Sequence, residues 1–372
     1  MANISIGIIG LPNVGKSTLF RALTSIAVPA EKYPFCTIDP NVGVVEVPDD
    51  RLDRLHEMLP PRKKVAPVVE FVDIAGLVKG ASRGEGLGNR FLHHVREADA
   101  LAHVVRVFEA GDVARASDSL DPIDDLTTID TELALADLEV VERTLDKLDK
   151  LARSGDKEAA CDAELLRRLD ALLDEGKAAR SASWSAEELA TLRPLNLLTL
   201  KPIMYVLNVG EESLGDESSG GDSEAADLLR GSIAERDLGA ECLPICAELE
   251  SEIHELADDE RGDYLETLGL EEEGLDRLIR AGYSLLGLQT FFTIGDAEVR
   301  GWTVRTGAHA PEAAGKVHTD FERGFIRAET IHFNDFERIG SLKDAREHGL
   351  LRFEGKDYVV RDGDILFFRA SP

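Results

Sequence analysis

Short apolar runs recur along the first and middle parts of this chain. They occupy residues 4–9, 68–73, 202–207 and 243–245, and each ends at small or polar residues. Runs of this length bounded by turn signals are typical of buried strands. A helix-like run at 18–23 follows the first of them, so the pattern predicts an α/β fold.

Between residues 129 and 196 the spacing of the leucines changes to that of a helix. Apolar positions recur every three or four residues on both sides of a break at 154–156. This spacing predicts an antiparallel helical hairpin closed by one apolar seam, and the repeats are too few to indicate an independent coiled coil. The seam positions are Leu138, Val141, Leu145, Leu148 and Ala152 before the break, and Leu165 or Leu166, Leu169, Leu172 and Leu173 after it.

The last part of the chain, residues 288–372, has a different pattern and a different charge. Alternating runs at 300–305, 358–360 and 365–368, with a turn-like segment at 362–364, predict a small β-rich domain. This part holds 12 basic and 14 acidic residues, so nearly all of the net charge of −29 belongs to the rest of the chain. We interpret the acidity as a solvated surface.

The composition and charge of the chain exclude several classes of protein. The 372 residues suffice for two or three domains, and the negative charge excludes general attraction to nucleic acid or anionic membranes, so that any RNA contact must be local. The four cysteines lack zinc-knuckle spacing and their scarcity favours a reducing compartment. No apolar run is long enough for a membrane span, and the N-terminus lacks a signal-peptide layout. We therefore expect a cytoplasmic protein without membrane contact.

A phosphate-binding loop follows the first predicted strand. Residues 10–17, Gly-Leu-Pro-Asn-Val-Gly-Lys-Ser, fit the pattern G-x-x-x-x-G-K-[ST] and stand between a strand and a helix, as that motif requires. Glycines let backbone N–H groups turn toward phosphates, the lysine bridges phosphate oxygens and the serine hydroxyl is a Mg²⁺ ligand. The predicted nucleotide-binding residues here are Asn13, Val14, Gly15, Lys16, Ser17 and Thr18.

A second set of residues suits a metal ion and a γ-phosphate. Asp73 ends the strand at 68–73, where a carboxylate can hold Mg²⁺ through water, and the N–H of Gly76 can reach a γ-phosphate. Thr37, in the segment 33–40, is a candidate second hydroxyl ligand, with a structural turn as the alternative. We predict Mg²⁺ held by Ser17, Thr37 and Asp73, and nucleoside triphosphate hydrolysis.

The two later strands lead into a candidate base site. GTP-binding proteins carry N-K-x-D at this place, whereas this chain has Asn208, Val209 and then Glu211. Because the usual aspartate accepts two charge-assisted hydrogen bonds from guanine, its loss favours ATP over GTP. Cys246 and Ala247, after the strand at 243–245, complete the predicted base site.

With these residues, the chain resembles the YchF family, also called Obg-like ATPases, along essentially its full length. The matching stretches are GLPNVGKST at 10–18, YPFCTIDPN at 33–41, FVDIAGLVKGASRGEGLGNRF at 71–91, Asn208 to Glu211, 308–321 and 361–364. The resemblance implies a P-loop domain at 1–128 and 197–287, a helical insertion at 129–196 and a β-grasp TGS domain at 288–372. It also implies Mg²⁺-dependent ATP hydrolysis and ribosome binding, for which we expect a monomer that contacts the large subunit through the TGS domain and the insertion.

The hydrolytic step has fewer clear candidates. Leu77 stands where a Ras-type GTPase has a water-orienting glutamine, so we expect slow turnover by a molecular switch. Family members are thought to use a loop histidine instead, which an ungapped alignment replaces here by Arg115, a side chain that cannot act as a base. The predicted catalytic residues are Lys16, Gly76 and Arg115. In related potassium-stimulated nucleotidases an asparagine at the place of Asn13 helps hold K⁺, which makes K⁺ a second candidate cofactor.

Two other functions remain open from the sequence. One is a ribosome- or RNA-binding adaptor for which nucleotide is a structural ligand, and the other is a conventional GTPase translation factor. Two basic sets are candidate RNA contacts, with ordinary solvated charges as the alternative. They are the segment 62–64 and the arginines Arg300, Arg305, Arg323 and Arg327.

Overall fold

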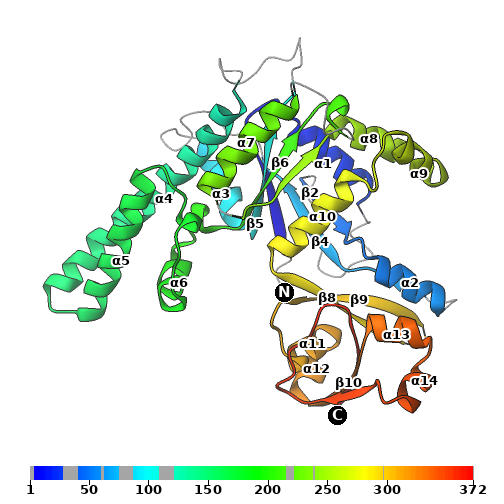
Figure 1. The fold of residues 1–372 in the computed structure, drawn as a ribbon. Helices are drawn as coiled ribbons and strands as arrows, with labels where there is room; N and C mark the ends of the chain where they lie inside the picture. The colour runs from blue at the N-terminus through cyan, green and yellow to red at the C-terminus, as the bar shows by residue number, and fades with distance from the viewer. Residues whose placement is uncertain are drawn as a thin grey trace. The chain divides into compact units, whose positions relative to one another are not determined.

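The structure is a computed structural model that describes residues 4–27, 41–59, 63–74, 87–108, 121–214, 222–237, 239–295 and 297–371. It divides into two compact units, one formed by Met1–Val44 and Glu70–Leu278 and the other by Val45–Val69 and Ile279–Pro372. Figure 1 traces the chain through both. This division differs from the expected domain bounds in that residues 45–69 and 279–287 belong with the C-terminal part.

A parallel sheet forms the centre of the first unit. β1 pairs in parallel with β4 and β5, and β5–β6 and β6–β7 are parallel as well, so the carboxyl ends of these strands share one edge of the sheet. The strand order is β2-β4-β1-β5-β6-β7. The bounds are Ser5–Ile9 for β1, Val42–Glu46 for β2, Val68–Asp73 for β4, Ala100–Arg106 for β5, Ile203–Asn208 for β6 and Cys242–Ile245 for β7. The four strands predicted from the apolar runs are confirmed.

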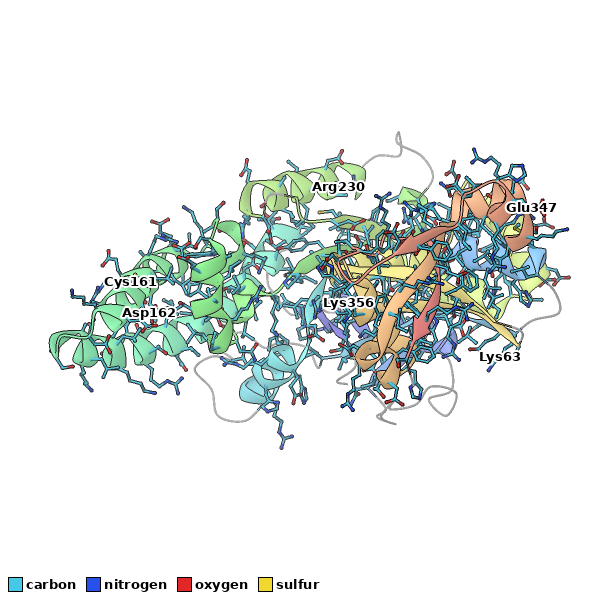
Figure 2. The ribbon with its side chains drawn as sticks, turned by 90° about the horizontal axis from the view of Figure 1, so that it is seen from below. Lys63, Cys161, Asp162, Arg230, Glu347 and Lys356 are labelled. Atoms are coloured by element: carbon cyan, nitrogen blue, oxygen red, sulfur yellow. The ribbon has the colours of Figure 1, made fainter. Side chains whose placement is uncertain are left out.

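Helices connect these strands. Their bounds are α1 Lys16–Ser25, α3 Leu87–Glu97, α4 Pro122–Arg153, α5 Lys157–Asp174, α6 Ala186–Leu192, α7 Asp222–Arg236, α8 Ala247–Glu255, α9 Asp258–Thr267 and α10 Gly274–Leu285, with 3₁₀ helices η3 Ala179–Ser181, η4 Arg193–Leu195, η5 Leu198–Leu200 and η6 Glu211–Ser213. Figure 2 shows Cys161 and Asp162 on α5 and Arg230 on α7. Within the described ranges, no helix combines the length and the apolar character needed to cross a bilayer.

The predicted helical hairpin is formed by α4 and α5, which project from the sheet (Figure 1). Leucines and valines of the predicted seam pack into one apolar cluster, in which Val141 and Leu169 are fully buried. The first helix begins at Pro122, earlier than the leucine spacing alone indicates. Asp121 accepts a hydrogen bond from the N–H of Ile123, and a proline is favoured at the first helical position, so these two residues set the start.

The second unit contains a mixed sheet with the strand order β11-β10-β12-β8-β9-β3. Its strands are β3 Lys63–Val65, β8 Leu288–Ile294, β9 Glu298–Arg305, β10 Phe325–His332, β11 Arg352–Glu354 and β12 Asp364–Ala370. Its shorter helices are α2 Asp50–Met58, α11 Ala310–Val317, α12 Thr319–Arg323, α13 Phe333–Ile339 and α14 Leu342–Glu347. The β-rich C-terminal domain predicted from the alternating runs is therefore present.

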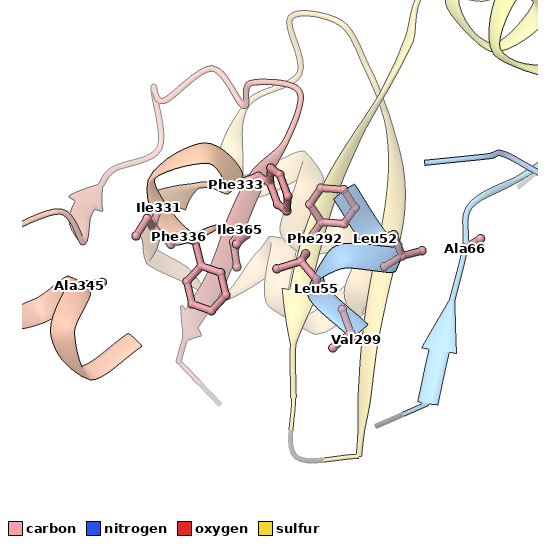
Figure 3. Packing of buried hydrophobic residues seen from close by; sticks show 10 residues of the cluster. All are labelled: Leu52, Leu55, Ala66, Phe292, Val299, Ile331, Phe333, Phe336, Ala345 and Ile365. Atoms are coloured by element: carbon pink, nitrogen blue, oxygen red, sulfur yellow. The ribbon is translucent and has the colours of Figure 1, made fainter. Parts of the chain in front are cut away.

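The segment 45–69 completes the core of the second unit. Leu52 and Leu55 on α2 pack into a buried cluster with Phe292, Ile331 and residues of α13 and α14 (Figure 3). β3 adds an edge strand parallel to β9. Arg51 forms an ion pair of 2.6 Å with Asp362. The apolar side chains of an amphipathic helix far away in sequence thus cover one face of the C-terminal sheet.

Candidate nucleotide-binding site

The loop between β1 and α1 has the backbone shape that phosphate binding requires. Gly15 precedes α1 with a φ of 97°, and Asn13 also has a positive φ, of 64°. A side chain at Gly10 would approach the carbonyl oxygen of Val104 to 2.5 Å. Only glycine fits such a close approach of two backbones, so the loop can wrap around the start of the helix with its N–H groups turned inward.

Asn208 joins this loop to the other end of the site. Its Nδ2 donates to the carbonyl of Val14 at 2.9 Å, and its Oδ1 accepts from the N–H of Ala247 at 3.1 Å. The side chain is buried, and a Cβ on Gly15 would lie 2.1 Å from its Nδ2. One amide therefore holds the phosphate loop against the loop that begins α8.

The electrostatics of the site centre on Lys16 and Asp73. Burial lowers the pKa of Lys16 to about 8, against the attraction of Asp73, which raises it. Burial raises the pKa of Asp73, and Lys16 opposes that shift. The Nζ of Lys16 donates to the carbonyl of Leu11 at 2.6 Å. The lysine is a desolvated cation, and binding of a polyanion would stabilise its charge.

Asp73 also carries a buried oxygen that suits a metal ion. Among the described residues, nothing donates a hydrogen bond to its Oδ1. Buried carboxylate oxygens normally have a partner, and a hydrated Mg²⁺ would supply one. Ser17 lines the same cavity as Lys16. Asp73 and Ser17 thus fit the predicted metal site, although the described part of the chain holds no cluster of three or more His, Cys, Asp or Glu side chains arranged for a metal.

A cavity of about 370 Å³ brings the predicted nucleotide-binding residues together. Val14 lies outside its lining and contributes the carbonyl that Asn208 holds. The predicted residues that line the cavity are Asn13, Gly15, Lys16, Ser17, Thr18, Asn208, Val209, Glu211, Cys246 and Ala247. The triphosphate end and the base end of the predicted site therefore form one continuous space.

Several residues that line this cavity were not predicted from the sequence. They are Arg106, Phe108, Gly210, Glu248, Leu249 and Glu252. The guanidinium of Arg106 lies 4.7 Å from the centre of the Phe108 ring, and its Nε donates to the carbonyl of Phe108 at 3.2 Å. The available signal was the run 100–105, apolar except for His103 and followed by the charged Arg106, because the carboxyl end of every parallel strand in such a sheet faces the ligand edge.

Three further candidates lie outside the described residues. They are Thr37, Gly76 and Arg115. Their assignments as metal ligand and catalytic groups stay predictions.

Comparison with known proteins places this geometry in a family. Residues 5–141 match a family model described as "50S ribosome-binding GTPase", and residues 288–371 match the YchF-type GTPase C-terminal model, described as "Protein of unknown function (DUF933)". "Ribosome-binding ATPase YchF" of Bacillus subtilis is 51% identical over 368 residues, covering 99% of each chain. This chain belongs to the YchF family.

Other YchF relatives match over the same length. "Ribosome-binding ATPase YchF" of Escherichia coli O157:H7 is 51% identical over 362 residues, 97% of this chain and 98% of the relative. "Obg-like ATPase 1" of Oryza sativa subsp. japonica is 41% identical, covering 100% and 93%. The solved YchF GTPase of Schizosaccharomyces pombe superposes with a TM-score of 0.88 at 35% identity, covering 99% and 98%. The predicted fold class, a P-loop α/β domain with a helical insertion and a TGS-type C-terminal domain, is confirmed.

Proposed function

We propose that this chain is a ribosome-binding ATPase that slowly hydrolyses ATP to ADP and phosphate as a molecular switch. The observation that carries the proposal is the buried, desolvated Lys16, which lines the cavity and is attracted by Asp73, whose Oδ1 has no hydrogen-bond partner among the described residues. Such an arrangement favours a bound polyanion together with a cation. The names of relatives that are about half identical over nearly their full length support the ATPase and ribosome-binding parts.

Each residue at the phosphate end of the site has a proposed role. Lys16 and the loop N–H groups neutralise and orient the β- and γ-phosphates. Ser17 and Asp73 would hold Mg²⁺, with Thr37 as a third ligand. When bound, Mg²⁺ supplies charge that offsets the charge developing on the phosphates. Gly76 would donate its N–H to the γ-phosphate, and Asn13 would help hold K⁺.

The base end supports a preference for ATP over GTP. Val209 lines the cavity as a buried apolar side chain where a lysine would stand in a GTP-binding protein, and Glu211 replaces the aspartate. Guanine therefore loses the two charge-assisted hydrogen bonds that normally select it. The solved relative bears the name GTPase, so a GTPase is the second candidate, and binding of the two nucleotides decides between them.

We propose that the helical insertion and the C-terminal unit make the contact with the ribosome. We place the contact on the large subunit and expect a cytoplasmic monomer. A nucleotide-dependent adaptor without important turnover would use the same surfaces. The two functions differ in one respect. Hydrolysis by a molecular switch is accelerated by its partner, whereas hydrolysis by an adaptor need not be.

Single-turnover release of phosphate from ATP, with and without purified ribosomes, tests this function. We expect slow release by the chain alone and faster release with ribosomes. Asp73→Asn keeps the shape of the side chain and removes its charge, so it should abolish release that depends on Mg²⁺. Arg115→Ala should slow release if its guanidinium stabilises the transition state, and Asn13→Ala should remove the response to KCl. Release that ribosomes leave unchanged would favour the adaptor.

A further inference from the structure

A buried arginine joins the helical insertion to the central sheet. Arg180 lies in η3, and its side chain is only 11% exposed. Its Nε forms an ion pair with Asp237, its Nη1 donates to the carbonyl of Thr199 at 3.2 Å, and its Nη2 donates to the hydroxyl of Tyr205 at 3.3 Å. Tyr205 belongs to β6 of the central sheet. The group that we call the Arg180 cluster consists of Asp130, Arg180, Thr199, Tyr205, Arg236 and Asp237.

The charges of this cluster have more than one possible pairing. Asp130 on α4 lies 3.9 Å from Nη2 of Arg180 and 3.8 Å from Nη1 of Arg236, beyond hydrogen-bond distance of either. α4 and α7 lie side by side at this place (Figure 1). A small movement of Arg180 from Asp237 toward Asp130 would therefore exchange one ion pair for another. Because buried ion pairs add little net stability compared with apolar side chains, stability alone does not explain this cluster.

Tyr205 belongs to a row of residues directly below the nucleotide cavity. It is opposite His103 on β5, and His103 is opposite Ile9 on β1. The ring centres of Tyr205 and His103 are 5.6 Å apart, and these two polar rings interrupt strands that would otherwise be apolar, as buried parallel strands normally are. Ile9 precedes Gly10 of the phosphate loop. Asn208, which holds that loop, follows Tyr205 by three residues, or about 10 Å of strand.

His103 is affected by charges on both sides of the sheet row. It is 1% exposed, and its Nδ1 has no hydrogen-bond partner within the described part of the chain. Burial lowers the pKa of His103 to about 3, and the positive charges of Arg180 and Lys16 lower it further. The ring is therefore neutral near pH 7 and lies in the field of one cation of the insertion and one of the phosphate loop. A polyanion bound at Lys16 changes the electrostatic field at the ring against which Tyr205 packs.

We propose that the Arg180 cluster couples the nucleotide cavity to the helical insertion. ATP held by the phosphate loop and Asn208 shifts β6, Tyr205 carries this shift to Arg180, and η3 moves with the guanidinium. Tyr205 and Arg180 act as positioning residues in this coupling. Since coupling between two sites is reciprocal, a partner that moves η3 changes the affinity for ATP by the same factor. The inference rests on the proposed ATP binding, and it gives a ribosome bound at the insertion a route to the site.

A tryptophan beside the cluster can report this movement. The Nε1 of Trp184 donates to the carbonyl of Ala179, the neighbour of Arg180, at 2.7 Å. The chain has two tryptophans, and the other is Trp302 on β9 of the second unit. In the full chain with Trp302→Phe, tryptophan emission therefore comes from Trp184 alone. We expect saturating ATP with Mg²⁺ to change this emission.

Tyr205→Phe in the same background tests the proposed route. It removes only the hydroxyl, and Tyr205 is not among the residues that line the cavity. ATP affinity measured by calorimetry should therefore fall by at most about tenfold, the effect of one hydrogen bond, while the emission change is lost. Arg180→Lys keeps the charge beside Asp237 but lacks the fork that reaches Tyr205, so it should give the same loss. Tyr283→Phe is the matched control, because it removes a buried tyrosine hydroxyl in the second unit, and it should keep the emission change.

The possible failures separate this coupling from the proposed function. ATP binding without any change in Trp184 emission contradicts the coupling alone. An unaltered emission change in Tyr205→Phe also overturns it, and so does an equal loss in Tyr283→Phe, which would indicate general destabilisation. Absence of ATP binding in the Trp302→Phe protein and in the wild type would overturn the proposed function and the coupling with it.

Discussion

At the scale of single residues, Gly15 and Asn208 fix the geometry of the phosphate loop. Gly15 adopts a φ of 97°, and its Cα faces the Asn208 amide so closely that a methyl group would lie 2.1 Å from Nδ2. That amide donates to Val14 and accepts from Ala247. Any side chain at position 15 would therefore displace the group that joins the two ends of the cavity.

Gly15→Ala should weaken both folding and nucleotide binding. Gly155 has the same φ of 97°, with nothing within 4 Å of an added Cβ, so Gly155→Ala is a matched control for backbone strain. Each substitution should cost about 1–2 kcal/mol of unfolding free energy for the left-handed conformation. Only Gly15→Ala should lose further stability and reduce ATP affinity at least about tenfold. Urea unfolding and titration with a fluorescent ATP analogue measure these effects, and equal ATP affinity of the two variants would contradict the account.

Lys16 should make the stability of the nucleotide-free protein depend on pH. Its pKa is about 8 in the folded state, because of burial, against about 10.4 in an unfolded chain. Between these values the unfolded state holds more protons, so the free energy of unfolding should rise with pH. In Lys16→Met this contribution is absent. Urea unfolding of both proteins from pH 7.5 to 10.5 gives the difference, and parallel curves would show that Lys16 is not desolvated.

The site was predictable from the sequence where its residues are contiguous. Residues 13–18 act through local backbone shape and side-chain type, both of which the motif specifies. The bond from Asn208 to Val14 spans 194 positions, and the place of Arg106 depends on the strand order β1-β5-β6. Neither follows from spacing along the chain, so these contacts required the structure.

At the scale of elements, a buried carboxylate anchors the helical insertion to the segment that leads into β6. Asp137 on α4 is fully buried and accepts hydrogen bonds from the N–H of Leu198, the N–H of Thr199 and the Thr199 hydroxyl, at 2.7–2.9 Å. These donors belong to η5, which precedes β6. The leucine spacing predicts the hairpin, because its seam is periodic, but a single acid within that helical run gives no sign of this anchor.

Asp137→Ala should therefore destabilise the protein strongly. Loss of a charged acceptor leaves three donors without their partner, for a cost of about 3 kcal/mol or more. Thr199→Val removes one of the three bonds and should cost about 1 kcal/mol. Urea unfolding followed by circular dichroism measures both values. Equal losses in the two variants would mean that the carboxylate does not anchor the helix.

At the scale of the whole molecule, the chain leaves the nucleotide-binding unit at residue 45 and returns at residue 70. The intervening α2 supplies Leu52 and Leu55 to the core of the C-terminal unit. Sequence patterns identify α2 as amphipathic but do not say which sheet it covers, since its apolar face suits either. The expected domain bounds, which follow the family resemblance, place residues 45–69 in the nucleotide-binding domain.

Leu55→Ala should consequently weaken the C-terminal unit. Removing this fully buried side chain costs about 2–5 kcal/mol. Hydrogen exchange should speed up in β8, β9 and β12 more than in β1 and β5. Leu23→Ala, which alters an equally buried leucine on α1, should give the reverse pattern. Faster exchange of β1 and β5 in Leu55→Ala, with β8 and β12 unchanged, would contradict the division into these units.

The central claim is that the cavity around Lys16 holds a triphosphate with Mg²⁺ and prefers adenine at its base end. Calorimetric titration of the full chain with ATP and with GTP in the presence of Mg²⁺ tests it most directly. The account predicts that ATP binds more tightly than GTP and that Lys16→Met binds neither well. Absence of ATP binding, or GTP binding tighter than ATP by about tenfold, would contradict it.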